Sequence, residues 1–126
     1  MEPVRTKRIL ILDDDLLAAQ LLAAMIKSLG DTEICERGSD ALARLRLAHF
    51  DAVISDYDMP EMNGIDFYHE AIAIDPALGR RFLFFTGADD NRFIQMVENH
   101  GVMFLRKPSS MGKLQCVVTR LLGNGP

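Results

Sequence analysis

The chain has 126 residues, a formal net charge of −4 and an apolar fraction of 48%. This length suits one domain with its own core but not two. The apolar fraction excludes a disordered chain, and an acidic balance without a Lys/Arg cluster argues against direct nucleic-acid binding.

The predicted elements alternate along the chain between short apolar runs and longer helical segments. Four apolar runs are typical of buried strands, at residues 8–12, 51–55, 81–85 and 102–106, and residues 32–35 are a short β candidate. Five segments favour helices, at residues 16–30, 39–50, 64–74, 91–101 and 111–122. Ser39 is the expected N-cap of the second helix, and glycines end the first and fourth. The alternation predicts an α/β fold, a parallel sheet covered on both faces with right-handed crossovers.

Neither a membrane span nor a secretion signal is predicted. The longest apolar-rich segment, residues 16–29, is too short to cross a bilayer and contains Gln20 and Lys27. Cys35 and Cys116 fit no metal or redox spacing, so we expect two reduced, partly buried thiols. A cytoplasmic location follows as the expectation.

The three histidines lack the spacing of metal ligands. We interpret His49, His69 and His100 as surface residues, with His100 near a helix end where its positive charge is favourable. Asp15 is interpreted as a helix cap.

Charged and hydroxyl side chains follow four of the five predicted strands. The residues in question are Asp13 and Asp14 after the first strand, Asp56 after the third, Thr86 with Gly87 after the fourth, and Lys107 after the fifth. Ligands of open parallel sheets bind beyond the carboxyl ends of the strands. We therefore expect these side chains to form one site.

The chemistry of this set points to phosphoryl transfer. Clustered carboxylates need a cation between them, and oxygen ligands of this kind suit Mg²⁺, with Mn²⁺ as an alternative. A carboxylate can also attack phosphorus and form an aspartyl phosphate. Lys107, the Thr86 hydroxyl and backbone amides near Gly87 would then stabilise the transferred group.

Four motifs carry a resemblance to a known family: ILILDDD, DAVISDYDMPEMNG, FLFFTGA and FLRKPSS. In this order and spacing they resemble the receiver domain of bacterial two-component response regulators. The resemblance covers about residues 7–122 and implies a single receiver domain over 1–126, either stand-alone or cut from a hybrid sensor histidine kinase. It also implies a flavodoxin-like (βα)5 three-layer sandwich with strand order 2-1-3-4-5.

The resemblance assigns the acidic residues to a phosphorylation site that uses Mg²⁺. By this resemblance Asp56 is the phosphoacceptor. Asp14 is the direct metal ligand and Asp13 acts through water, while Asp58 offers its backbone carbonyl. The acidic side chain of Asp58 is a departure, because many receivers carry a neutral group beside the acceptor.

The resemblance also implies a switch that responds to phosphorylation. Thr86 is then the switch hydroxyl, Lys107 pairs with the phosphoryl group, and Phe104 occupies the aromatic switch position with Phe in place of the commoner Tyr. The surface that would change is formed by the fourth helix, fifth strand and fifth helix. Its candidate edge residues, each with ordinary core packing as the alternative, are Phe93, Met96, Phe104 and Met111.

The implied function is that of a signalling domain in a phosphorelay, and not of a metabolic enzyme. The domain would take a phosphoryl group from a histidine kinase or a phosphotransfer protein and act on a downstream protein target. The alternative is a haloacid-dehalogenase-type phosphohydrolase that uses Asp56. Against it stand the position of Asp56 on the third strand and the lack of a cap segment. A binding-only receiver without phosphoryl control is a third reading, opposed by the intact acidic set.

The first predicted helix contains more large apolar residues than one buried stripe needs. They are Leu16, Leu17, Leu21, Leu22, Met25, Ile26 and Leu29. Such a helix can dock a helical histidine-kinase bundle, as the resemblance implies. Denser packing of the protein's own core is the equal alternative.

Overall fold

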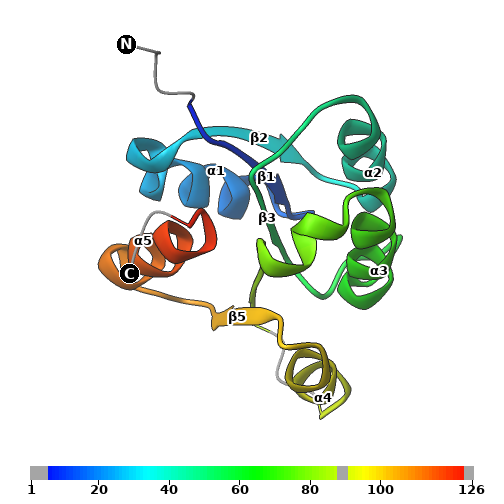
Figure 1. Ribbon diagram of the computed structural model, residues 1–126. Helices are drawn as coiled ribbons and strands as arrows, with labels where there is room; N and C mark the ends of the chain where they lie inside the picture. Colours follow the sequence, from blue (N-terminus) through cyan, green and yellow to red (C-terminus); the bar gives the residue numbers. More distant parts are fainter. Residues whose placement is uncertain (1–5, 88–90, 124–126) are drawn as a thin grey trace.

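All five predicted strands lie in one parallel sheet in the computed structural model, which describes residues 6–87 and 91–123 (Figure 1). The strands are β1 (Arg8–Leu12), β2 (Asp31–Cys35), β3 (Ala52–Ser55), β4 (Phe82–Thr86) and β5 (Met103–Arg106). Their order in the sheet is β2-β1-β3-β4-β5, and every pair is parallel. The predicted fold and strand order are therefore confirmed.

Helices cover both faces of the sheet. They are α1 (Leu16–Met25), α2 (Gly38–Leu47), α3 (Gly64–Ile74), α4 (Asn91–His100) and α5 (Met111–Leu121), with short 3-10 helices at Lys27–Leu29 and Pro76–Arg80. Figure 1 shows α1 and α5 on one side of the sheet and α2, α3 and α4 on the other. The first helix ends at Met25, earlier than predicted, and the 3-10 helix completes the segment.

The core lies in two layers because successive side chains of a strand point to opposite faces. On β1, Ile9 and Ile11 pack beneath α1 and α5, whereas Leu10 and Leu12 pack on the other face. All four side chains are fully buried. A strand buried on both faces reads as a continuous apolar run, which is why the sequence pattern identified the central strands β1, β3 and β4.

The helix ends confirm two of the predicted signals and correct a third. Asp15 caps α1, since its Oδ1 accepts a hydrogen bond from the amide of Ala18 at 3.2 Å. Gly101 follows α4 with a positive φ of 63°, the conformation that glycine adopts at little cost. The prediction of Ser39 as a cap is wrong, because α2 begins at Gly38. The Ser39 amide instead donates to Glu61 Oε1 at 3.3 Å, so a distant carboxylate satisfies this first-turn donor.

A buried carboxylate ties β1 to β3 at the amino end of the sheet. Asp51 Oδ2 accepts a hydrogen bond from the Arg8 amide at 2.9 Å, and the Asp51 amide donates to the Arg8 carbonyl at 2.8 Å. This acid lies at the opposite end of β3 from Asp56. It stabilises the pairing of β1 with β3, so β3 is preceded by a structural carboxylate and followed by one at the candidate site.

The two thiols are unpaired, with Cys35 buried and Cys116 exposed. The expectation of partial burial therefore holds for Cys35 but not for Cys116. Among the helices of residues 6–87 and 91–123, none has the length and apolar character needed to cross a membrane.

Candidate functional site

The structure brings Asp13, Asp14 and Asp56 together at the carboxyl end of the sheet. One carboxylate oxygen from each lies within 4.8 Å of the other two. The register explains this proximity, because Leu12 pairs with Ser55 and the acids directly follow these partners. Parallel pairing of β1 with β3 thus converts two distant sequence motifs into one acidic cluster.

Backbone donors fix the orientation of Asp56. Its own amide donates to the Leu12 carbonyl at 2.9 Å, and its Oδ1 accepts from the Tyr57 amide at 2.7 Å. The Ser55 hydroxyl donates to the Asp56 carbonyl at 2.7 Å. These contacts direct Oδ2 toward Lys107 and leave the side chain partly accessible from solvent.

Lys107 bridges the two central acids. Its Nζ lies 2.7 Å from Asp13 Oδ2 and 3.4 Å from Asp56 Oδ2. Burial by itself would lower the pKa of Lys107, but the hydrogen bond to Asp13 and the charge of Asp56 outweigh it and raise the pKa. The side chain is therefore an ammonium ion that offsets part of the charge of the acidic cluster.

The two acids that follow β1 differ in what they contact. Asp13 is buried, and its oxygens accept from the Asp15 amide at 2.9 Å and from Lys107. Asp14 is exposed, and within residues 6–87 and 91–123 its carboxylate has no hydrogen-bond partner. Asp14 can therefore accept a cation from solvent without breaking a contact, whereas Asp13 is already engaged on both oxygens.

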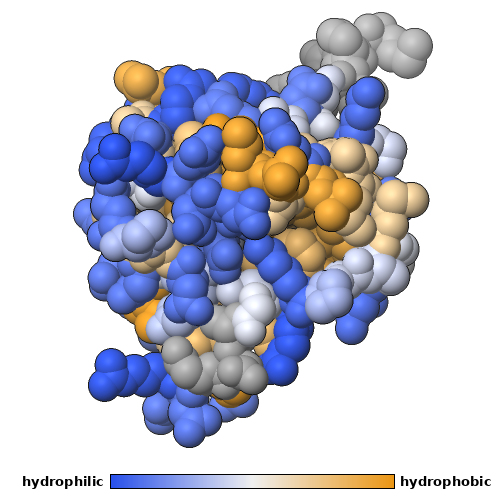
Figure 2. Space-filling model, turned by 180° about the vertical axis from the view of Figure 1, so that it is seen from behind, coloured by the Kyte–Doolittle hydropathy of each residue, from blue (hydrophilic) through white to orange (hydrophobic). Residues whose placement is uncertain are grey.

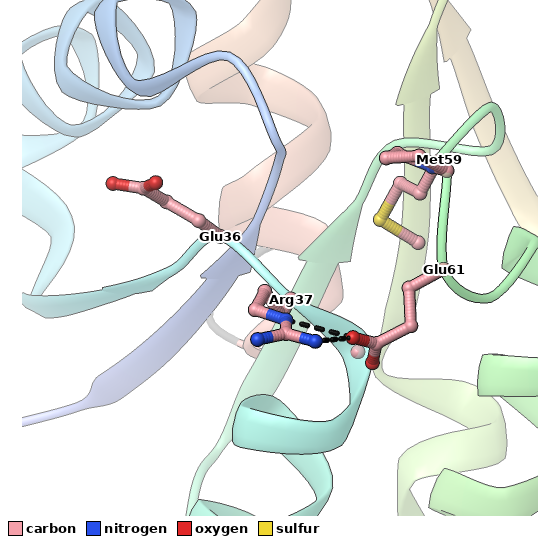
Figure 3. A pocket seen from close by; sticks show the side chains of 6 residues that line it. Glu36, Arg37, Met59 and Glu61 are labelled. Carbon is pink, nitrogen blue, oxygen red and sulfur yellow. Dashed lines mark hydrogen bonds and ion pairs between the residues drawn. The ribbon is translucent and has the colours of Figure 1, made fainter.

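An ion pair joins the β2–α2 loop to the β3–α3 loop that follows Asp56. Arg37 contacts Glu61 Oε2 through both Nε, at 2.7 Å, and Nη2, as Figure 3 shows. Gly38 packs against the Met62 side chain at the same place. A Cβ added at residue 38 would lie only 3.1 Å from the Met62 sulfur, so a larger residue would crowd this contact. Sequence reasoning missed this contact, since a charge pair between distant loops has no local pattern.

The proposed switch residues lie at the carboxyl end of β4 and on β5. Thr86 is buried as the last residue of β4, and the Lys107 amide donates to its carbonyl at 2.9 Å. Phe104 is 38% exposed, and its ring packs edge-on against Phe93 with centroids 5.4 Å apart. Gly87 is exposed beyond β4, and Asp58 is exposed beyond β3.

The four candidate edge residues separate into two pairs. Phe93 and Met96 are buried in the core beneath α4, so the alternative of core packing holds for them. Phe104 and Met111 are exposed, as a surface role requires.

The apolar residues of α1 also separate by face. Leu22 and Ile26 are buried, whereas Leu17 is 78% exposed and Leu21 is 63% exposed. Denser core packing is therefore wrong as an explanation of Leu17 and Leu21. Figure 2 shows apolar side chains gathered on the side of the molecule where α1 lies. A shallow groove runs from Leu21 to Lys107 and Pro108, so the exposed apolar face reaches the edge of the acidic site.

Comparison with known proteins places these features in a family. The response regulator receiver domain model matches residues 9–119. The transcriptional regulatory protein CrdR of Helicobacter pylori is 27% identical over 95% of this chain and 57% of its own length. A response regulator receiver protein of Anaeromyxobacter is 39% identical over 67% of this chain and 36% of its own length. The chain thus spans about half of the first relative and about a third of the second.

Solved structures share the fold. A CheY-like receiver domain protein from Methanospirillum hungatei superposes with a TM-score of 0.87 at 22% identity, over 94% of this chain and 95% of that one. The chemotaxis protein CheY4 of Vibrio cholerae gives a TM-score of 0.81 at 25% identity, over 93% and 99% of the two chains. With the family match across nearly the whole chain, these findings show that the protein belongs to the response regulator receiver domain family.

Proposed function

We propose that the chain is a cytoplasmic phosphoacceptor domain in which Asp56 receives a phosphoryl group from a histidine kinase or a histidine phosphotransfer protein. The observation that carries the proposal is the position of Asp56. Its carboxylate lies within reach of Asp13, Asp14 and Lys107, yet remains accessible. Membership of the receiver domain family supports this proposal, because it makes the chain a signalling domain and not a classical enzyme.

The chain's own residues suit in-line attack on phosphorus. An Asp56 oxygen would form the O–P bond while the P–N bond to the donor imidazole breaks. The Tyr57 amide holds the carboxylate in place, and Lys107 supplies a positive charge for the phosphoryl oxygens. The Thr86 hydroxyl and the amide of Gly87 would complete the set of donors.

The donor set fits a hard dication. Carboxylates of Asp14 and Asp56, the backbone carbonyl of Asp58, and Asp13 through water would hold Mg²⁺, or Mn²⁺ in its place. The ion would neutralise negative charge on the transferring group.

Phosphorylation would then act on the α4–β5–α5 surface. The phosphoryl group adds about −1.5 to −2 charges and strong acceptor oxygens. Thr86 would turn to donate to them, and the ring of Phe104 would enter the vacated space. In support, the exposed ring of Phe104 contacts Phe93, and the Lys107 amide donates a hydrogen bond to the Thr86 carbonyl.

The exposed face of α1 supports a helical partner. Leu17 and Leu21 present apolar area to solvent, and the groove from Leu21 to Lys107 is continuous with the acidic site. A helical bundle seated on α1 would bring a phosphohistidine toward Asp56. No direct contact with nucleic acid or insertion into a membrane is part of this function; the output is a protein target.

The test is phosphorylation by a small donor. With Mg²⁺ and phosphoramidate or acetyl phosphate, intact-mass measurement should show one acid-labile phosphoryl group. Asp56→Asn and Asp56→Ala should abolish it, and Asp15→Asn, which changes a neighbouring acid but keeps a capping side chain, should not. Undiminished labelling of both Asp56 variants would place the acceptor elsewhere. Sustained turnover of p-nitrophenyl phosphate would instead favour the hydrolase alternative.

A further inference from the structure

Two of the three histidines, which are far apart in the sequence, lie side by side on the surface. His69 belongs to α3 and His100 is the last residue of α4. Their ring centroids are 5.2 Å apart with the ring planes at 70°, and both side chains are exposed. Their sequence spacing gave no sign of a pair, because the packing of α3 and α4 on one face of the sheet creates it.

The hydrogen bonding of His100 leaves one of its ring nitrogens available to bind a metal. Its Nδ1 lies 3.0 Å from the carbonyl oxygen of Met96. A carbonyl oxygen only accepts, so Nδ1 carries the proton in neutral His100 and Nε2 keeps its lone pair. Metal-binding histidines commonly donate their second ring nitrogen to a backbone carbonyl in this way. Within the described residues the His69 ring takes no hydrogen bond, so either nitrogen can supply a lone pair.

The separation of the rings matches two imidazoles that share one ion. With nitrogen–metal distances of about 2.0–2.1 Å and tetrahedral angles, the two ring centroids lie roughly 5 Å apart. The observed 5.2 Å meets this requirement, and because the rings pack edge to face, one ring turns on binding so that both lone pairs point to the same ion. Added positive charge is also favourable there, because His100 ends α4 at the negative pole of the helix dipole.

We propose that His69 and His100 form a binding site for a divalent transition-metal ion that joins α3 to the end of α4. Imidazole nitrogen selects Zn²⁺, Ni²⁺ or Cu²⁺ and disfavours Mg²⁺, which takes oxygen ligands. The site is therefore chemically and spatially distinct from the acidic cluster at Asp56. Its remaining coordination positions are filled by water, and the ion binds only when both imidazoles are neutral.

The experiment uses the untagged protein in saturating Mg²⁺, so that the acidic cluster does not compete. Zn²⁺ is titrated while imidazole resonances are followed by NMR and heat is measured by calorimetry. We expect one ion per chain, with shifts at both His69 and His100, and none from Mg²⁺ alone. His69→Gln and His100→Gln should each weaken binding at least about tenfold, because a second ligand on the same scaffold acts at high effective concentration.

The third histidine provides the matched control. His49 is exposed and lies elsewhere, near Asp51, so His49→Gln should bind Zn²⁺ as the wild type does. His69→Gln leaves the His100–Met96 hydrogen bond in place, so its loss of affinity would not come from damage to the end of α4. A double variant should bind no better than either single variant. Wild-type affinity in both single variants, or shifts confined to one ring or to the residues around Asp56, would overturn the proposal.

Discussion

The Lys107 ammonium donates its shorter hydrogen bond to Asp13, at 2.7 Å, rather than to Asp56, at 3.4 Å. Without a phosphoryl group Lys107 therefore contacts both acids, and Asp13 is the closer of the two. Asp13 thus holds the positive charge beside the proposed acceptor, and the Asp56 oxygen is only loosely engaged.

We predict that Lys107→Arg retains Mg²⁺ binding and some phosphoryl transfer but loses most of the conformational response. Arginine keeps the charge, but its planar fork cannot replace a point contact between two acids. The measurement compares amide spectra of wild type and variant with a beryllofluoride phosphoryl mimic. Equal shifts around Thr86 and Phe104 in the two proteins would show that Lys107 does not couple the site to the switch surface.

Asp14→Asn should weaken Mg²⁺ binding and raise stability in the absence of metal. The reason for the second effect is that removing one of three clustered carboxylates relieves repulsion, by about 1 kcal/mol at these separations. Isothermal titration and urea unfolding measure the two quantities. Asp15→Asn is the control, since Asp15 caps α1 outside the acidic cluster. Unchanged Mg²⁺ affinity would remove Asp14 from the ligands.

Two first-turn glycines should respond oppositely to alanine. A Cβ on Gly64 would lie 2.7 Å from the Phe84 ring and 2.8 Å from the Tyr57 Cα, so Gly64→Ala should destabilise by about 1–3 kcal/mol. Gly112 has nothing within 4 Å of such a Cβ, so Gly112→Ala should stabilise by about 0.4–1 kcal/mol. Chemical denaturation measures the free energy of unfolding of both variants. A Gly64→Ala variant as stable as the wild type would mean that α3 can move away from β3 and β4.

The two thiols should differ sharply in reactivity. Burial and the nearby charge of Glu33 raise the pKa of Cys35 to about 11, which suppresses its thiolate, whereas Cys116 is exposed. At pH 8 we expect a thiol reagent to label only Cys116 quickly in the native protein, and both cysteines in denaturant. Cys116→Ser should abolish the fast phase. Rapid labelling of Cys35 in that variant would indicate local opening of β2.

Glu33 should contribute stability that is lost in acid. The Arg44 side chain donates to its carboxylate at 2.5 and 3.1 Å, and this contact lowers the pKa of Glu33 from its usual 4.5. A carboxyl whose pKa is lower in the folded state stabilises fully above its unfolded pKa and loses this contribution as pH falls through the folded value. Glu33→Gln should therefore be less stable than wild type at pH 7 and similar to it near pH 2. Glu36→Gln, which alters an exposed neighbouring acid, should show no such convergence.

The sequence predicted the central strands β1, β3 and β4 well because each is buried on both faces and reads as one apolar run, whereas the edge strands β2 and β5 are partly exposed. It also predicted the acidic cluster, since the carboxyl ends of parallel strands meet at one edge. It could not predict contacts between loops or helices that depend on packing. The assignment of Ser39 as a cap failed because the carboxylate that accepts from its amide, Glu61, lies on another loop and leaves no local pattern. The His69–His100 pair exists only because α3 and α4 pack on the same face of the sheet. The exposure of Leu17 and Leu21 could not be predicted either, because it depends on how α1 is oriented on the sheet, which composition does not determine.

Backbone hydrogen bonds cross three of the four strand boundaries at the carboxyl end of the sheet: the amide of Asp13 donates to Cys35, that of Asp56 to Leu12, and that of Lys107 to Thr86. These bonds fix the spacing of the backbones that carry the acids, the hydroxyl and the lysine. An exposed side chain at the site, such as that of Asp14, therefore rotates on a picosecond-to-nanosecond scale, while any displacement of α4 is collective and takes microseconds or longer. The two processes are separable in time, so relaxation measurements should find a quiet sheet edge beside a slowly exchanging helix.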